Sequence, residues 1–267
     1  MSSNVFNYRG TPIRYRDSGS GAVILLLHGF LESLEMWEDY TSELESKYRV
    51  ISIDLPGHGQ SGCFGYVHSM EEMAECVKAV ADHLRLKRYH MIGHSMGGYV
   101  SLAFAELYPD IPKSITLFHS TALADSEEKK KDRDRAIKLV KDNADGFIKQ
   151  AVPLLFRSKS RELYRSRVKE LVRFALRTPL QGVVAALEGM KERPDREVLL
   201  HLSPVPFLFI AGKRDTVLPF EKIKPQLSAP RVIDRLVTEN SHMGFIEDRD
   251  LCLETIEYFI HDIEKKK

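Results

Sequence analysis

The sequence predicts a doubly wound α/β fold with a mostly parallel sheet, an antiparallel hairpin at its start and an insertion of helices. Short apolar segments such as residues 22–27 alternate with segments of helical periodicity, as buried parallel strands alternate with crossover helices. This alternation stops between residues 123 and 202, where only helical periods occur. A serine flanked by glycines lies in residues 93–98, where an apolar segment meets a helical one.

The first elements are an antiparallel pair followed by alternating strands and helices. Residues 5–8 and 13–16 alternate polar and apolar side chains around a turn at residues 10–12, which predicts a β-hairpin. From residue 22 onward, apolar runs favour buried strands and the intervening segments favour helices. We expect strands at 22–27, 50–53, 89–92 and 114–118, and helices at 34–48, 70–84 and 99–108.

The helical periods of residues 123–202 predict a cap inserted into a core formed by residues 1–122 and 203–267. The charged run at residues 127–135 is expected to be a solvated helix face or a hinge, and it receives no binding role. Within the insertion we expect helices at 132–141, 145–155, 160–176 and 179–191. The core then resumes with strands at 205–211 and 231–236 and a last helix at 249–264.

Composition favours an enzyme that acts on a small molecule. The 39 Lys and Arg residues nearly balance the 38 Asp and Glu residues, so no strong field is available to hold nucleic acid or an anionic membrane. Residues 1–4 begin no signal-like segment, and the apolar run at 22–27 is too short for a bilayer, so we expect a cytoplasmic protein without membrane insertion. Cys63, Cys76 and Cys252 lack metal-ligand or disulfide-framework spacing, so we expect no metal.

The run Gly93-His94-Ser95-Met96-Gly97-Gly98 is typical of a nucleophile elbow, a sharp turn from a strand into a helix. Such a turn lifts the Ser95 hydroxyl clear of the sheet, and glycines at 93 and 97 remove side chains that would collide there. The Met96 backbone N–H, at the start of the helix, is predicted to help bind the oxyanion of a tetrahedral intermediate. The second donor is predicted to be the Phe30 N–H, in the loop after the strand at 22–27.

A serine nucleophile needs a general base and a carboxylate that orients the base. Asp215 directly follows the apolar strand at 205–211, and His242 lies in the loop before the last helix. An aspartate after a strand is by itself more often a turn former, and His242 alone is an ordinary loop histidine. Their occurrence in the order Ser, Asp, His, each after a predicted strand, favours a catalytic triad.

Other side chains compete for these roles less well. Asp234 lies within a predicted strand, while Asp248 and Asp250 are placed to cap the last helix. His58 and His119 also follow strands and are candidates for the border of the pocket. Neither histidine lies in the last loop between a strand and a helix, where the base is expected.

Taken together, these residues resemble the α/β-hydrolase fold family, in its small, cap-bearing branch of serine esterases and lactonases. The resemblance implies that Ser95 is the nucleophile, His242 the base, Asp215 its partner, and the Phe30 and Met96 backbones the oxyanion hole. Dehalogenases and epoxide hydrolases of the family are disfavoured, because they use an aspartate where this chain has Ser95. The resemblance rests on His28-Gly29-Phe30, Asp54 to Ser61, Gly93 to Gly98, Asp215 and His242.

The function expected from these observations is hydrolysis of a small or medium carboxylic ester through an acyl-enzyme, with no metal or organic cofactor. The same triad also serves lactone, thioester or carbon–carbon bond hydrolysis or a menaquinone-type lyase step, and a non-catalytic ligand receptor is a third possibility. Oligomeric state and the physiological substrate stay open. Apolar side chains expected either to line an acyl pocket or to pack the cap on the core are Leu31, Leu155, Phe156, Val217 and Met243.

Overall fold

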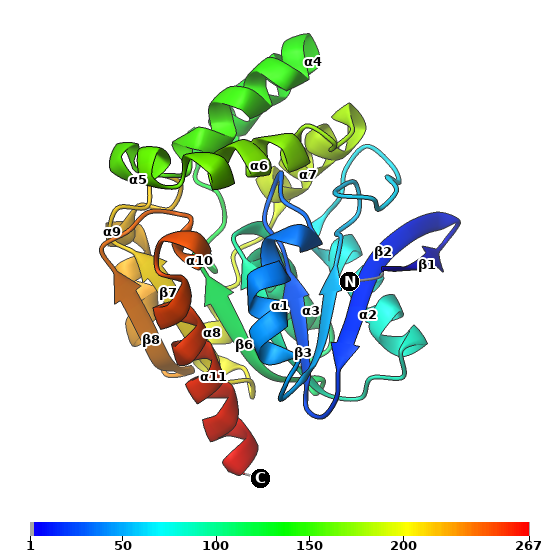
Figure 1. Cartoon of the computed structure of the whole chain (residues 1–267), viewed down its shortest axis with the longest axis vertical. Coiled ribbons are helices and arrows are strands. Elements are labelled where there is room, and N and C mark those ends of the chain that lie inside the picture. Colours follow the sequence, from blue (N-terminus) through cyan, green and yellow to red (C-terminus); the bar gives the residue numbers. More distant parts are fainter. Residues whose placement is uncertain (1–2, 267) are drawn as a thin grey trace.

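The computed structural model describes residues 3–266, which form one eight-stranded sheet with helices around it (Figure 1). The strand order is β1-β2-β4-β3-β5-β6-β7-β8. The strands are β1 (Asn4–Tyr8), β2 (Thr11–Gly19), β3 (Val23–Leu27), β4 (Arg49–Ile53), β5 (Tyr89–His94), β6 (Pro112–Phe118), β7 (Phe207–Gly212) and β8 (Val232–Thr238).

The antiparallel part of the sheet is confined to its N-terminal end, as the sequence predicts. β1 and β2 form the hairpin, and β2 also pairs antiparallel with β4, whereas all strands from β4 to β8 are parallel. β2 is longer than predicted, because residues 16–19 extend past the hairpin and pair with β4. The doubly wound, mostly parallel fold class is therefore confirmed.

Helices cover both faces of the sheet and bury its central strands. Ile24, Leu25, Leu26 and Leu27 of β3 are fully buried, as expected for a strand covered on both sides. α1 and α11 lie together on one face, and α2 and α3 lie together on the other (Figure 1). The bounds are η1 (Leu34–Trp37), α1 (Glu38–Leu44), α2 (Met70–His83), α3 (Met96–Leu107) and α11 (Arg249–Lys265).

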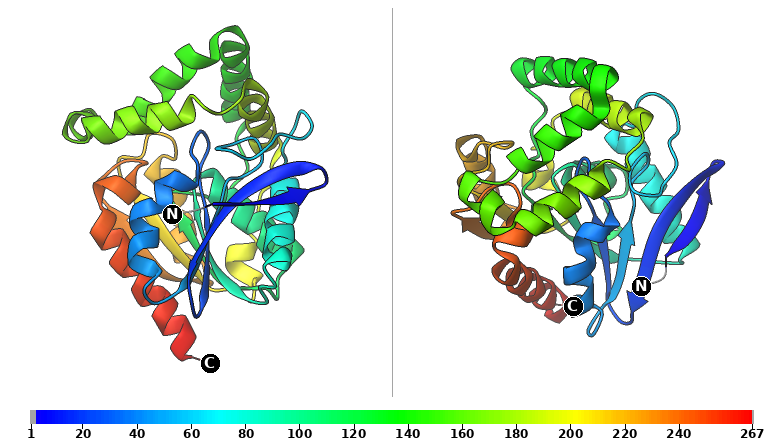
Figure 2. Two further views of the ribbon diagram at one scale, coloured as in Figure 1. Left: turned by 45° about the vertical axis from the view of Figure 1, so that its right-hand side comes forward. Right: turned by 45° about the horizontal axis from the view of Figure 1, so that its top comes forward.

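Five helices lie between β6 and β7 in the chain, and the first four of them, α4 to α7, form a layer over one end of the sheet, whereas α8 packs against α3 in the core (Figures 1 and 2). They are α4 (Glu127–Leu154), α5 (Ser158–Leu163), α6 (Arg165–Ala175), α7 (Leu180–Glu192) and α8 (Leu199–Leu202). The remaining short helices are α9 (Phe220–Ile223), η2 (Lys224–Ser228) and α10 (Gly244–Glu247), in the loops that follow β7 and β8.

α4 begins earlier than predicted, and it is kinked. Ser126 caps it, because its hydroxyl accepts a hydrogen bond from the Lys129 backbone N–H at 3.3 Å. The charged run at residues 127–135 therefore forms the first turns of a helix. At Asn143 the backbone leaves the helical region, and its side chain accepts a bond from Gly146 N–H at 2.9 Å, so a second helical segment starts there.

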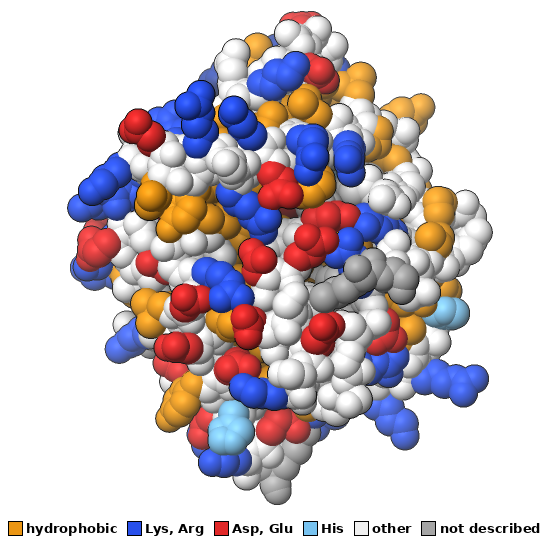
Figure 3. All heavy atoms as spheres, viewed as in Figure 1, with side chains coloured by type: hydrophobic (Ala, Val, Ile, Leu, Met, Phe, Trp, Pro, Cys, Tyr) orange, Lys and Arg blue, Asp and Glu red, His pale blue; other side chains and the backbone are white. Residues whose placement is uncertain are grey.

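Charged side chains of both signs are interspersed over the face shown in Figure 3, in line with the small net charge of the sequence. Cys63, Cys76 and Cys252 are all free thiols. Among residues 3–266, no helix combines the length and apolar character that crossing a bilayer requires.

Candidate active site

Ser95 lies at a sharp turn between β5 and α3. Its backbone has φ 49° and ψ −112°, a positive φ that a serine adopts only under strain. The two glycines around it are needed for close packing: a Cβ on Gly93 would lie 2.3 Å from the Gly97 carbonyl oxygen, and a Cβ on Gly97 would lie 2.3 Å from the Leu27 oxygen. The strained turn thus depends on both glycines.

Neighbouring strands hold the turn in place. The Ser95 N–H donates to the Phe118 carbonyl at 2.9 Å, and the Ser120 hydroxyl donates to the Ser95 carbonyl at 2.8 Å. Both partners come from the end of β6 and the residues after it. The elbow is therefore fixed by the sheet as well as by its own glycines.

Asp215 and His242 meet in the loops that follow β7 and β8. His242 Nδ1 and Asp215 Oδ2 are 2.7 Å apart, and both side chains are almost fully buried. The other oxygen, Oδ1, accepts hydrogen bonds from the backbone N–H groups of Val217 at 2.8 Å and Leu218 at 2.9 Å. Burial raises the pKa of Asp215, but its two histidine neighbours outweigh burial and hold that pKa well below its usual range. Asp215 is thus a carboxylate.

The second of these neighbours is His119. Its Nδ1 lies 3.4 Å from Asp215 Oδ2, and burial lowers its pKa, which favours the neutral ring. His119, Asp215 and His242 each offer an atom within 4.8 Å of the others, which makes them the one group of this kind that could hold a metal within residues 3–266. A hydrogen bond already joins His242 Nδ1 to Asp215 Oδ2. This arrangement suits a general base and the acid that orients it better than it suits a set of metal ligands.

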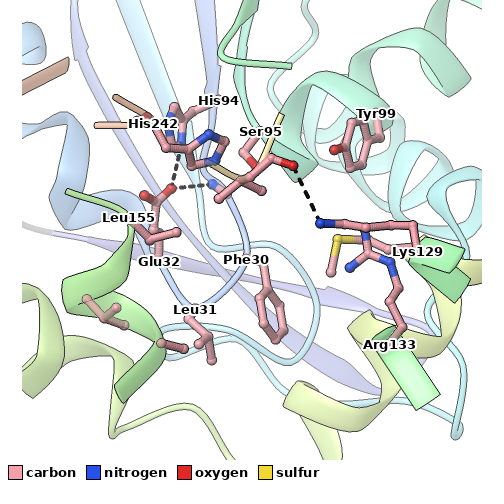
Figure 4. A pocket seen from close by; sticks show the side chains of 15 residues that line it. Phe30, Leu31, Glu32, His94, Ser95, Tyr99, Lys129, Arg133, Leu155 and His242 are labelled. Atoms are coloured by element: carbon pink, nitrogen blue, oxygen red, sulfur yellow. Dashed lines mark hydrogen bonds and ion pairs between the residues drawn. The ribbon is translucent and has the colours of Figure 1, made fainter. Parts of the chain in front are cut away.

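Ser95 and His242 line one cavity of about 100 Å³, shown in Figure 4. Among the described residues, no hydrogen bond joins the Ser95 hydroxyl to the His242 ring. Bonds between nucleophile and base are often long in unliganded sites and tighten when substrate binds. The His242 backbone is tied to the elbow, because its carbonyl lies 3.0 Å from His94 Nε2.

The two backbone N–H groups predicted to bind an oxyanion belong to Phe30 and to Met96, the residue after Ser95. Phe30 lines the cavity directly, and Met96 is the first residue of α3. Within residues 3–266, neither N–H donates to another protein group. An N–H group without a protein acceptor is free to donate to a substrate oxygen, and the role of these two groups as oxyanion donors stays a prediction.

Glu32 and His94 form a buried pair that the sequence did not reveal. Glu32 Oε2 lies 2.8 Å from His94 Nδ1 and accepts a bond from Gly29 N–H at 2.6 Å. Burial disfavours the charged form of each side chain. The attraction and hydrogen bond of the oppositely charged partner outweigh burial, so the pKa of Glu32 is lowered and the pKa of His94 is raised. The pair links the loop that carries Phe30 to the elbow that carries Ser95 (Figure 4).

The predicted pocket residues fall into three groups. Leu31, Leu155 and Val217 line the cavity that contains Ser95. Met243 lines a smaller apolar recess beside it, together with Leu31 and Leu155. Phe156 is buried and lines neither space. Their roles toward a substrate stay predictions.

Two cavity residues come from a segment to which the sequence analysis gave no binding role. Lys129 and Arg133, one turn apart on α4, line the cavity with Ser95, and Tyr99 of α3 lies beside them (Figure 4). Their spacing places them on one helix face, and this spacing is the signal by which the sequence could have identified them. The sequence did not distinguish this face of the helix, because every residue from 127 to 135 is charged.

The comparisons with known proteins agree with the observed fold. A family model described as "alpha/beta hydrolase fold" matches residues 22–248. The chain is 28% identical over 253 residues to a pimeloyl-[acyl-carrier protein] methyl ester esterase of Vibrio atlanticus, covering 90% of this chain and 95% of that protein. It superposes with a TM-score of 0.91 on a thermophilic esterase from Thermogutta terrifontis with malate bound, at 29% identity, covering 98% of this chain and 99% of the other.

A further relative has a different name. The dihydrolipoyllysine-residue acetyltransferase component of the acetoin cleaving system of Pseudomonas putida is 30% identical over 255 residues. The match covers 89% of this chain but only 64% of that protein. Because the family model spans most of the sequence and the similar proteins above include named esterases, this chain is an enzyme and belongs to the alpha/beta hydrolase fold family.

Proposed function

We propose that the enzyme hydrolyses small or medium carboxylic esters through an acyl-enzyme on Ser95. The observation that carries this proposal is the buried Asp215–His242 hydrogen bond of 2.7 Å, beside the cavity that Ser95 shares with His242. The names of the similar esterases support the same reaction class. The modest size of the cavity favours a small or medium acyl group.

In the acylation step, Ser95 Oγ attacks the ester carbonyl carbon while its proton passes to His242 Nε2. The carbonyl oxygen becomes an oxyanion, which accepts hydrogen bonds from the N–H groups of Phe30 and Met96. Asp215 holds His242 in the tautomer whose Nε2 is free to accept a proton, and it stabilises the charged ring that forms.

The intermediate then collapses. The bond from the carbonyl carbon to the alcohol oxygen breaks, and His242 Nε2 gives its proton to the leaving alcohol. A water molecule next attacks the acyl-enzyme, with its proton passing to His242. The carboxylic acid leaves as the Ser95 hydroxyl regains the proton, which closes the cycle.

In this scheme residues 123–202 act as a cap over the site. Lys129, which lines the cavity, belongs to α4, and Leu155, which also lines it, directly follows that helix, while Ser95 and His242 belong to the core. Leu31, Leu155 and Val217 would then contact the acyl group. The cap would limit the size of the substrate and exclude water from the acyl-enzyme.

A substrate panel tests the reaction class. Purified enzyme is assayed with p-nitrophenyl esters of increasing acyl length, with lactones and with acyl-CoA thioesters. We expect the highest kcat/KM on esters of short or medium chains. Turnover of lactones or thioesters without turnover of short esters would support acyl transfer on Ser95 but contradict the ester proposal.

A further inference from the structure

The wall of the cavity formed by α4 carries more positive charge than the protein itself neutralises. Lys129 and Arg133 both line the cavity that contains Ser95 (Figure 4). Both side chains are largely withdrawn from solvent; the Arg133 side chain is only 11% exposed. Cations in such places are normally paired.

Arg133 is only partly paired. Its Nε donates to an oxygen of Asp125, while its two terminal Nη groups donate to no other described residue. Asp125 is shared, because Arg193 Nη2 lies 2.8 Å from its other oxygen. One carboxylate therefore serves two guanidinium groups. Arg193 is otherwise fixed by the carbonyls of Met190 and Leu123.

Lys129 has a still weaker set of partners. Its ammonium donates to the Val217 carbonyl at 3.4 Å, a long hydrogen bond to a neutral oxygen. Burial lowers the pKa of Lys129, and the neighbouring Arg133 adds to this effect. An anion placed beside Lys129 would relieve both penalties.

The acidic groups nearby do not supply that anion. Glu32 lines the cavity but is already bonded to His94 and Gly29 N–H. Glu128 and Asp132 line a neighbouring, more open groove, which shares Lys129 with the cavity, and both are exposed to solvent. Two cations of the cavity wall, Lys129 and Arg133, together with Arg193 behind the wall, are thus balanced only by the one carboxylate of Asp125, which does not line the cavity itself.

We infer that Lys129 and Arg133 form a subsite for a carboxylate of the substrate, so that the enzyme prefers esters that carry a free carboxylate. This inference rests on the proposed function of Ser95. A carboxylate fits because the free Nη groups of Arg133 and the ammonium of Lys129 are able to donate to its two oxygens. Apolar Val152 and Leu155 line the same cavity and would contact the carbon chain between the carboxylate and the ester.

The test compares charged and neutral esters of matched size. One arm uses monoethyl esters of succinic, glutaric and adipic acids against ethyl esters of alkanoic acids of similar length, which places the charge on the acyl side. A second arm uses acetoxyacetate against propyl acetate, which places the charge on the alcohol side. We expect kcat/KM to be at least tenfold higher for the charged member of one arm, and that arm identifies the side of the ester that faces α4.

Variants connect the preference to the two cations. We expect Lys129→Met to lower the ratio of kcat/KM between the charged and neutral members by about tenfold or more, and Lys129→Arg to restore part of it. Lys131→Met is the matched control, because Lys131 is exposed on the same helix and lines none of the cavities described above. A wild-type enzyme with no preference in either arm, or a preference that survives Lys129→Met, overturns the inference.

A binding measurement separates this inference from the proposed function. Glutarate is titrated calorimetrically into Ser95→Ala and into Ser95→Ala/Lys129→Met at low ionic strength. We expect at least tenfold weaker binding to the double variant. If no ester is hydrolysed by the wild-type enzyme, the proposed function fails, yet this titration still decides the subsite. Equal affinities of the two variants overturn the subsite whatever the enzyme hydrolyses.

Discussion

Glu32 Oε2 lies 2.8 Å from His94 Nδ1, and this buried pair ties the loop after β3 to the turn that carries Ser95. The same carboxylate oxygen accepts from Gly29 N–H, one residue before the predicted oxyanion donor Phe30. One side chain therefore links the segment of the proposed nucleophile to the segment of the predicted oxyanion donor. Small displacements of catalytic groups reduce the rate strongly. We therefore expect this link to affect catalysis as well as stability.

We predict that Glu32→Gln destabilises the protein by about 2 kcal/mol, because a charged hydrogen-bond acceptor in the interior is replaced by a neutral amide. We also expect kcat to fall by roughly tenfold with little change in KM, since Glu32 positions the donor loop and the elbow. Urea unfolding and steady-state kinetics measure the two effects. Glu38→Gln is the control, because the Glu38 side chain is 46% exposed and its ion pair with Arg16 lies at the surface, and it should change neither. An unchanged kcat in Glu32→Gln would show that the link has no catalytic consequence.

The Glu32–His94 pair also predicts how stability depends on pH. The pKa of Glu32 is lowered, so its contribution is present above its unfolded pKa of about 4.3 and is lost as the pH falls through the lowered value. The pKa of His94 is raised, so its contribution is complete below about 6.5 and is lost as the pH rises through the raised value. The stability difference between wild type and Glu32→Gln should peak between about pH 4.5 and 6.5. A difference that grows steadily above pH 7 contradicts this account.

Asp215→Asn tests the acid of the proposed triad. We expect a folded protein whose kcat falls by several orders of magnitude, up to about 10⁴-fold, because the amide favours the wrong tautomer of His242. Asp234→Asn, on β8, should retain normal activity. Near-normal turnover by Asp215→Asn would assign the role to another carboxylate.

Gly97→Ala tests the close packing at the elbow. The added Cβ would lie 2.3 Å from the Leu27 carbonyl oxygen, so we expect a loss of about 1–3 kcal/mol in the free energy of unfolding, together with most of the activity. Gly10→Ala is the control, since Gly10 has φ 83° but open space around it. It should cost about 1 kcal/mol from backbone strain and leave activity intact. Gly97 itself has no positive φ, so a loss of stability no larger than that of Gly10→Ala, with activity retained, would contradict the close-packing account.

Leu155→Ala tests the acyl pocket. Leu155 lines the cavity, so its truncation should shift the preferred p-nitrophenyl ester toward longer acyl chains. The neighbouring Leu154 is 58% exposed, and Leu154→Ala should leave the chain-length profile as it is. If the two variants share one profile, Leu155 packs the cap on the core and does not contact the acyl group.

The residues proposed for catalysis were predictable because they follow parallel strands. Carboxyl ends of such strands meet at one edge of the sheet, so Ser95 after β5, Asp215 after β7 and His242 after β8 had to come close. The start of α3 was predicted less well. The helical period begins to show at Tyr99, but α3 starts at Met96, because two glycines with low helix propensity are needed there for close packing.

The buried pair and the cationic wall depend on contacts between distant segments. Glu32 and His94 lie 62 positions apart in the sequence, and nothing in the local pattern of either segment indicates their pairing. Lys129 and Arg133 lie in a helix whose first turns carry charge on every side. Only the packing of α4 over the cavity distinguishes the face that turns inward.

The most direct test of the account is whether Ser95 is an activated nucleophile. Wild-type enzyme and Ser95→Ala are incubated with a fluorophosphonate probe, and the adduct is located by mass spectrometry of the digested protein. We expect one covalent adduct on Ser95 in the wild-type enzyme and none in Ser95→Ala. A folded wild-type enzyme that stays unlabelled, or equal labelling of the two proteins, would contradict it.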